Sequence, residues 1–209
     1  MTDPNRTELV LVIDQSGSML PLQEVTIRNI NEYADKQKAL PGRCGLTLVF
    51  FNNEWKIPAS VDLTQWVPLN TNTYKPSGTT EMLATIRATI DTVGQRLAAL
   101  PEDQRPGLVL FVIVTDGEEN PPKLKEVWDQ TLDMVKHQRG VYKWQFVFLG
   151  ANIDAPKVAQ TLGVAANLAS TYSATVGGTS KAYNAVNRVT SELRVTGKLS
   201  HDLSADLDD

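Results

Sequence analysis

The chain has 209 residues, of which 42% are hydrophobic and 21% are charged, a composition typical of a folded globular domain. Its 20 basic and 24 acidic residues give a formal net charge of −4, which leaves no basic excess for a nucleic-acid backbone. The longest apolar run, residues 108–114, is far shorter than a membrane span, and the polar start lacks the features of a signal peptide. Cys44 is the only cysteine, so no internal disulfide can form. We therefore expect a cytoplasmic protein that binds neither nucleic acid nor membrane.

The first predicted element is a strand over residues 9–13, an unbroken run of branched apolar residues that is typical of a strand buried on both faces of a parallel sheet. The run ends at Asp14. Ser16 and Ser18 follow at alternate positions, with the conformationally free Gly17 between them. A loop that turns here brings one carboxylate and two hydroxyls to the carboxyl end of a central strand, where open α/β sheets bind their ligands.

A helix, a hairpin and a second helix are predicted next. An apolar face at helical spacing indicates the first helix over residues 21–38. Residues 46–51 and 55–63 are expected to form an antiparallel hairpin at an edge of the sheet. A loop over residues 65–79, rich in turn-forming residues, then delivers Thr80 to the start of the second helix.

The second half of the chain repeats the alternation of strand and helix. The most apolar predicted strand, residues 108–114, leads into Thr115, Asp116 and Gly117. The later predicted elements are a helix over 124–135, a strand over 145–149, a short helix over 155–162, a weak strand near Leu168 and a last helix over about 180–194.

This alternation predicts one α/β domain over residues 1–196. We expect a Rossmann-like, doubly wound and mainly parallel central sheet, with one antiparallel edge strand and helices on both faces. Residues 197–209 are acidic and contain scattered small residues, so they are predicted to form a mobile tail.

Oxygen-bearing side chains gather at the predicted carboxyl ends of the strands. Two carboxylates and three hydroxyls favour a hard divalent cation, because zinc would require histidine or cysteine ligands. Mg²⁺ is our first choice, with Mn²⁺ or Ca²⁺ as alternatives. Aspartate contacts made through water would leave one coordination position open to a carboxylate from another molecule. The candidate metal ligands are Asp14, Ser16, Ser18, Thr80 and Asp116.

Thr79 is an alternative to Thr80 as a ligand. We prefer Thr80 because its spacing from Met82 and Ile86, two residues of the apolar stripe, places it at the entrance of the helix. The helix dipole there adds positive potential.

Together these motifs resemble the von Willebrand factor type A (vWA) fold with its metal-ion-dependent adhesion site (MIDAS). The resemblance covers about residues 8–195. The segments YKPSGTTEM, VTDGEEN and FVFLGANIDA look most like the intracellular bacterial and phage branch of the family, which is found with tellurium-resistance-type gene neighbours. The resemblance implies direct metal contacts from the hydroxyls, and direct or water-mediated contacts from the carboxylates.

Two other groups of polar residues lie near the predicted strand ends. Glu118 and Glu119 are expected to form a solvated loop rather than a second metal site. Asn152 and Asp154 are expected to form a turn and a helix cap after Gly150, rather than the rim of the metal site.

The preferred function is a non-enzymatic binding module, in which the ion bridges this protein to an acidic residue of a partner protein. The resemblance suggests a bacterial or phage stress, assembly or defence system. The alternative is a metal-assisted hydrolase of the phosphoester type at the same site. Catalysis by Ser16 lacks a visible base, because His137 falls in a predicted helix and His201 in the tail.

The acidic tail raises a further hypothesis of self-association. Asp206, Asp208 or Asp209 of one molecule could fill the open metal position of its neighbour and so produce dimers or chains.

Overall fold

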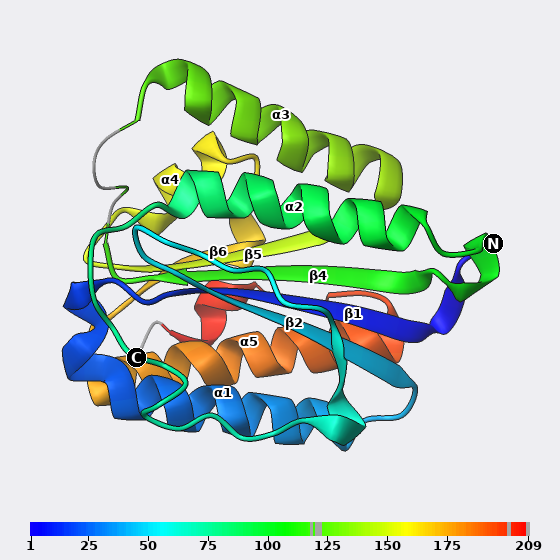
Figure 1. Ribbon diagram of the computed structural model, residues 1–209, viewed down its shortest axis with the longest axis horizontal. Coiled ribbons are helices and arrows are strands. Elements are labelled where there is room, and N and C mark those ends of the chain that lie inside the picture. Colours follow the sequence, from blue (N-terminus) through cyan, green and yellow to red (C-terminus); the bar gives the residue numbers. More distant parts are fainter. Residues whose placement is uncertain (118, 120–122, 200–201, 208–209) are drawn as a thin grey trace.

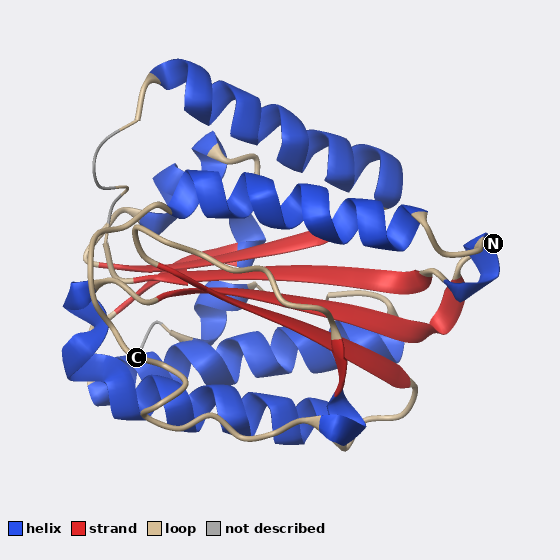
Figure 2. Cartoon of the chain, viewed as in Figure 1, coloured by secondary structure: helices blue, strands red, loops and turns tan. Residues whose placement is uncertain are grey.

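The computed structural model describes residues 1–117, 119, 123–199 and 202–207. A six-stranded sheet in the order β3-β2-β1-β4-β5-β6 lies between two layers of helices (Figures 1 and 2). The strands are β1 (Asp3–Asp14), β2 (Arg43–Phe51), β3 (Val61–Asp62), β4 (Pro106–Thr115), β5 (Gln145–Ala151) and β6 (Ala169–Tyr172). The α-helices are α1 (Gln23–Lys38), α2 (Met82–Ala98), α3 (Lys125–Tyr142), α4 (Ala155–Thr161) and α5 (Val176–Thr196). The predicted fold class is confirmed.

Strand β1 is the centre of the sheet because it pairs in parallel with β2 on one side and with β4 on the other. Its apolar run from Leu9 to Ile13 is at most 1% exposed. Helices α1 and α5 cover one face of the sheet, and α2, α3 and α4 cover the other (Figure 1). A strand covered on both faces must be apolar on both, which explains why this run does not alternate with polar residues.

The strand order reverses between β1 and β4. The chain passes from β1 to β2 on one side, and later returns to the other side of β1 with β4, β5 and β6. In open α/β sheets the loops diverge at such a switch point and leave a crevice at the carboxyl ends of the strands. Asp14 ends β1 and Asp116 directly follows β4, so these two predicted metal ligands lie at this place.

The antiparallel edge strand is confirmed, but it is much shorter than the predicted extended piece over residues 55–63. Strand β3 contains only Val61 and Asp62, which pair with Leu46 and Gly45 of β2. One further isolated bridge joins Phe51 to Trp55. Pro58 lies between the two paired places and has no N–H to donate, which interrupts a continuous ladder.

The start of α1 differs from the prediction. A 3-10 helix over Gly17–Leu22 precedes α1, which begins at Gln23, because Met19 and Leu22 are buried and hold the chain close to the fold. Here tertiary contacts outweigh the helical period of the sequence. Helix α2 begins at Met82, so Thr80 lies at its entrance, as predicted.

The described part of the C-terminal segment packs on the domain. A 3-10 helix over Leu203–Asp206 follows α5, and Leu203 is fully buried. The boundary at residue 196 remains a prediction, and residues 208 and 209 of the self-association hypothesis lie outside the described residues. Within the described ranges no helix is long and apolar enough to cross a bilayer.

A buried carboxylate fastens the amino-terminal half of β1 to its neighbours. Glu8 is 1% exposed; its Oε1 accepts hydrogen bonds from Thr47 Oγ1 at 2.8 Å and from an Arg96 guanidinium nitrogen at 2.6 Å. Its Oε2 accepts from Ser60 Oγ at 3.0 Å. The ion pair therefore joins β1, β2 and α2 and anchors the segment that precedes β3.

We predict that Glu8→Ala lowers the free energy of unfolding by about 3–5 kcal/mol, because it leaves the Arg96 charge without its buried partner. Urea denaturation at pH 7 measures this loss. The control is Lys125→Ala, which removes the exposed Lys125–Asp129 pair at 2.6 Å and is expected to cost about 0–1 kcal/mol. Equal losses in the two variants would show that the buried ion pair stabilises the fold no more than the exposed pair does.

Candidate metal centre

The site begins with the Asp14 carboxylate at the end of β1. Asp14 has no solvent exposure, and both of its carboxylate oxygens are hydrogen-bonded. Oδ1 accepts from the backbone N–H of Ser16 at 2.7 Å, and Oδ2 accepts from Thr115 Oγ1 at 2.6 Å. Because Ile13 pairs with Val114, the parallel register brings the next residues, Asp14 and Thr115, side by side. The carboxylate is therefore fixed in orientation by β4 and by its own loop.

A chain of side-chain hydrogen bonds continues from this loop to the next strand. Ser16 Oγ lies 3.0 Å from Ser18 Oγ, and Ser18 Oγ donates to Asp116 Oδ1 at 2.7 Å. Ser16 and Asp116 are buried, while Ser18 is exposed. The structure thus brings together four of the predicted ligands, namely Asp14, Ser16, Ser18 and Asp116.

Thr80 reaches the same edge of the sheet through backbone contacts. The Gly17 N–H donates to the Gly78 carbonyl at 3.1 Å, and the Ser77 N–H donates to the Gln15 carbonyl at 2.8 Å. Thr80 follows two residues after Gly78 and is 6% exposed. Gly78 has φ +75°, and a Cβ there would overlap the side chain of Asn53, so this turn requires glycine.

Several supporting residues were not predicted from the sequence. Tyr74 Oη donates to the Asp14 carbonyl at 2.7 Å, and Tyr172 Oη donates to the Thr115 carbonyl at 3.3 Å. Asn152 Nδ2 donates to the Asp116 carbonyl at 3.2 Å. These donors hold the backbone that carries the site. The segment YKPSGTTEM contained Tyr74, but nothing in its spacing indicated a hydrogen bond to β1.

The turn and helix cap predicted after β5 are confirmed. Asn152 adopts a left-handed backbone conformation with φ 58°, and the Asp154 carboxylate accepts from the Lys157 N–H at 3.1 Å as the N-cap of α4. Asn152 nevertheless also contacts the site through Asp116, so it combines a turn role with a supporting role.

The electrostatics of the set favour a cation. Burial raises the pKa of Asp14, the hydrogen bonds from Thr115 and Ser16 lower it in part, and the charge of Asp116 raises it further. Burial likewise raises the pKa of Asp116, against the hydrogen bond from Ser18. Burial disfavours the charged form of both carboxylates, and a nearby positive ion would stabilise that form.

The chemistry of the donor set fits a hard cation. Every side-chain donor in it is a carboxylate or hydroxyl oxygen, and such ligands suit Mg²⁺, Mn²⁺ or Ca²⁺. In the described part of the chain, no group of three or more histidine, cysteine, aspartate or glutamate residues is placed to hold a metal. Any ion at this edge would therefore depend on hydroxyls as well as on the carboxylates of Asp14 and Asp116.

The prediction that Glu119 belongs to a solvated loop is wrong. Glu119 is 6% exposed, and its Oε2 accepts from the Leu83 N–H at 3.0 Å. Burial raises its pKa to about 7, although the hydrogen bond from Leu83 opposes this shift. A pair of acidic residues in a loop is expected to be exposed, but here the start of α2 covers Glu119. Glu118 lies outside the described residues.

A hollow of about 580 Å³ adjoins the site and is lined by residues of α2, α3 and α4. Met82, Gly117 and Ile153 line it, and they follow Thr80, Asp116 and Asn152 closely in the chain. Its charged lining residues comprise three lysines and three acids, namely Lys123, Lys125, Lys157, Glu119, Asp129 and Asp154. A molecule bound at the strand ends would therefore meet apolar side chains and side chains of both charges.

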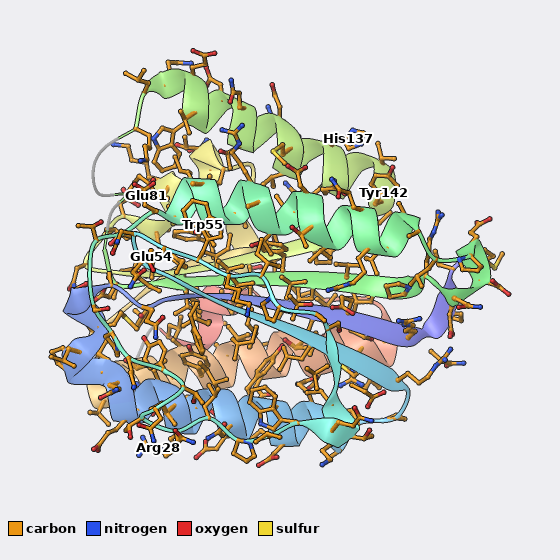
Figure 3. The ribbon with its side chains drawn as sticks, in the orientation of Figure 1. Arg28, Glu54, Trp55, Glu81, His137 and Tyr142 are labelled. Atoms are coloured by element: carbon orange, nitrogen blue, oxygen red, sulfur yellow. The ribbon has the colours of Figure 1, made fainter. Side chains whose placement is uncertain are left out.

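The histidine considered for a hydrolase lies far from this edge. Figure 3 shows His137 with Tyr142 towards the right-hand end of α3, whereas Glu81 marks the left-hand start of α2 beside Thr80. The rings of His137 and Tyr142 are 5.6 Å apart. His201 lies outside the described residues.

No protein-family model matches the chain, and no curated protein matches it by sequence. Solved structures do match it. The ArnB paralog VWA2 from Sulfolobus acidocaldarius matches with 15% identity and a TM-score of 0.53, over 87% of this chain and 44% of that one. A von Willebrand factor type A structure from Catenulispora acidiphila matches with 13% identity and a TM-score of 0.54, over 89% of this chain and 43% of that one.

A third structure is that of proximal thread matrix protein 1 from the mussel byssus, with a zinc-occupied MIDAS motif. It matches with 15% identity and a TM-score of 0.59, over 90% of this chain and 47% of that one. This chain therefore spans less than half the length of each of these proteins. At such identities the likeness concerns the fold, and the chain has the fold of von Willebrand factor type A domains.

Proposed function

We propose that Asp14, Ser16, Ser18, Thr80 and Asp116 hold a divalent cation, with Mg²⁺ preferred and Mn²⁺ or Ca²⁺ as alternatives. The chain then acts as an interaction module whose ion accepts an acidic residue of a partner protein. The observation that carries the proposal is the hydrogen-bonded path from Asp14 to Asp116 at the switch point of the sheet. The zinc-occupied motif in the mussel protein supports a divalent cation at a site of this kind, and because that ion is zinc it does not support the preference for Mg²⁺.

The partner's carboxylate follows from the composition of the site. The protein supplies two carboxylates and otherwise neutral hydroxyls, so Mg²⁺ would keep water in its remaining positions, and an external carboxylate could replace that water. The adjoining hollow offers apolar walls and charged side chains of both signs for the residues that flank the partner's acid. The mussel matrix protein among the structural neighbours supports a protein partner.

The finer setting is also part of the proposal. A cytoplasmic location and a role in a bacterial or phage stress, assembly or defence system rest on the resemblance of three sequence segments and on the single cysteine. Fractionation of the source cells, followed by detection of the chain, tests the location. Recovery outside the cytoplasm would remove this part and leave the metal proposal intact.

We predict that the wild-type chain binds one Mg²⁺ or Mn²⁺ ion in isothermal titration calorimetry, and that Asp116→Ala or Ser16→Ala abolishes this uptake without loss of fold. The loss should exceed the ~10–100-fold change that residues outside the ligand set usually cause. Asp154→Ala is the matched control, because it removes a carboxylate at the same sheet edge that caps α4 instead. No uptake by the wild type would refute the proposal.

A second prediction concerns pH. The raised pKa values of Asp14 and Asp116 mean that their ionisation destabilises the metal-free fold: their favourable contribution is complete below the unfolded pKa of about 4 and is lost as pH rises through the folded pKa. A bound cation reverses this penalty and competes with protons. The rise in Tm on addition of Mg²⁺ should therefore be larger at pH 7.5 than at pH 5.

Thermal unfolding at the two pH values measures this difference. At a free ion concentration 100 times the Kd, binding stabilises the fold by about 2.7 kcal/mol. Asp116→Asn serves as the control, since it keeps the shape of the side chain but removes a titrating ligand, and its Tm should respond little to Mg²⁺ at either pH. A wild-type response that is independent of pH would contradict the assignment of these carboxylates.

A third prediction concerns the partner. On an array of peptides that each contain one Asp or Glu, the chain should be retained only with Mg²⁺ present, and each Asp→Asn or Glu→Gln twin should lose retention. Retention that survives a chelator would count against the proposal. Turnover of p-nitrophenyl phosphate that requires Mg²⁺ and disappears in Asp14→Ala would instead favour the hydrolase alternative.

A fourth prediction concerns self-association through the acidic tail. A variant with Asp206→Asn that also lacks residues 208 and 209 distinguishes capture of a partner from capture of the tail of a second copy. If self-association occurs through the tail, sedimentation of the wild type will change on chelation and that of the variant will not. If the mass of the wild type in solution does not change on chelation, self-association through the tail is refuted. The segment 197–209 then supplies no ligand to the metal of a second copy.

A further inference from the structure

We propose that Glu119 and Lys123 are positioning residues, and that their contacts with Leu83 and Glu81 at the start of α2, together called the clamp, set the affinity of the site for its ion. This inference rests on the proposed function. It concerns two residues that contribute no ligand atom, and it explains why an acidic side chain is buried three residues after Asp116.

Helix α2 has no cap of its own. Glu81 occupies the N-cap position with φ −102° and ψ 59°, and its side chain makes no capping hydrogen bond. The first N–H groups of a helix have no partner within the helix and need one elsewhere. Glu119 supplies it from another element, since its Oε2 accepts from the Leu83 N–H at 3.0 Å. A residue after β4 thus replaces the local cap.

Lys123 makes a second contact with the residues at the start of α2. Lys123 Nζ lies 2.7 Å from Glu81 Oε2 and 2.9 Å from Glu81 Oε1. The side chains are 23% and 20% exposed, so this pair is more shielded than an ordinary surface salt bridge. Glu81 directly follows Thr80, and it is visible at the start of α2 in Figure 3. Glu119 and Lys123 therefore contact two residues that closely follow Thr80, namely Leu83 and Glu81.

The clamp completes a ring of contacts around the candidate ligands. Ser18 holds Asp116 on the side of β1. The Glu81 N–H donates to the Asn52 carbonyl at 2.9 Å, which fixes the backbone next to Thr80 on the side of β2. The contacts of Glu119 and Lys123 close the remaining side, between Asp116 and Thr80. Release of the clamp would leave the separation of these two ligands less determined.

The consequence depends on the ion. Mg²⁺ demands near-ideal octahedral geometry at about 2.0–2.1 Å, whereas Ca²⁺ accepts a looser and more variable shell. A site whose ligands move more freely should therefore lose affinity for Mg²⁺ more than for Ca²⁺. A change in this preference separates a positioning role from a general loss of stability, which would weaken both ions alike.

The test is calorimetric titration of the full chain with Mg²⁺ and with Ca²⁺. We expect Glu119→Ala and Lys123→Met each to weaken Mg²⁺ binding by ~10-fold, the lower end of the effect seen for groups that orient ligands. Ca²⁺ binding should weaken clearly less. Glu119→Gln should restore most of the Mg²⁺ affinity, because its amide oxygen can still accept from the Leu83 N–H.

Two matched controls share the type of contact but lie elsewhere. Asp62→Ala removes the carboxylate that accepts from the Thr64 N–H at 2.8 Å and caps a 3-10 helix over Leu63–Gln65. Arg43→Met removes the ion pair with Asp3, which joins the amino-terminal ends of β2 and β1, at the opposite edge of the sheet from the site. Neither control should change the affinity for Mg²⁺ or its ratio to the Ca²⁺ affinity.

The outcomes distinguish the clamp from the metal proposal itself. If the wild type binds Mg²⁺, Asp116→Ala does not, and both clamp variants keep the wild-type affinities, the clamp is overturned and the site stands. If the wild type binds no ion, both ideas fall. Should Glu119→Ala not fold, Lys123→Met decides by the same criterion.

Discussion

A carboxylate without solvent exposure lies at the carboxyl end of the central strand, and its burial constrains everything around it. Asp14 could not be tolerated there unless both of its oxygens were hydrogen-bonded, and Thr115 and the Ser16 backbone provide those bonds. Those two contacts in turn require β4 to lie beside β1 and the loop after β1 to turn back at once. The local geometry of the candidate site and the topology of the sheet therefore depend on the same interaction.

The parallel sheet brings hydrogen-bond donors close to this carboxylate. Because β1 and β4 run side by side in parallel, their carboxyl ends coincide, and the residues that follow each strand lie close together without long connecting loops. The order of the strands reverses at this pair, so neighbouring crossovers diverge and leave space above it. Chains with this fold can thus present polar loop residues on a rigid apolar frame, and what those residues bind depends on the side chains they carry.

The loops at this edge are joined to one another by hydrogen bonds. Backbone hydrogen bonds join the segment of Gly17 to that of Gly78, and side-chain contacts join the segment of Asp116 to those of Ser18 and of Leu83. Tyrosine hydroxyls and an asparagine amide hold the carbonyls beneath them. A ligand that moves one loop would therefore meet resistance from the others, which is the behaviour expected of a preorganised site.

The sequence by itself determined the main strands and helices, the mainly parallel character of the sheet, the position of Thr80 at the entrance of α2, and the strand ends at which Asp14, Ser16, Ser18 and Asp116 meet. This was possible because unbroken apolar runs and helical stripes reflect burial directly, and because parallel strands bring their carboxyl ends together. Only the tertiary structure decided the order of the strands, that β3 is two residues long and that Glu119 is buried as the cap of another helix. These features depend on single contacts between residues far apart in the chain, and such contacts leave no periodic signal in the sequence.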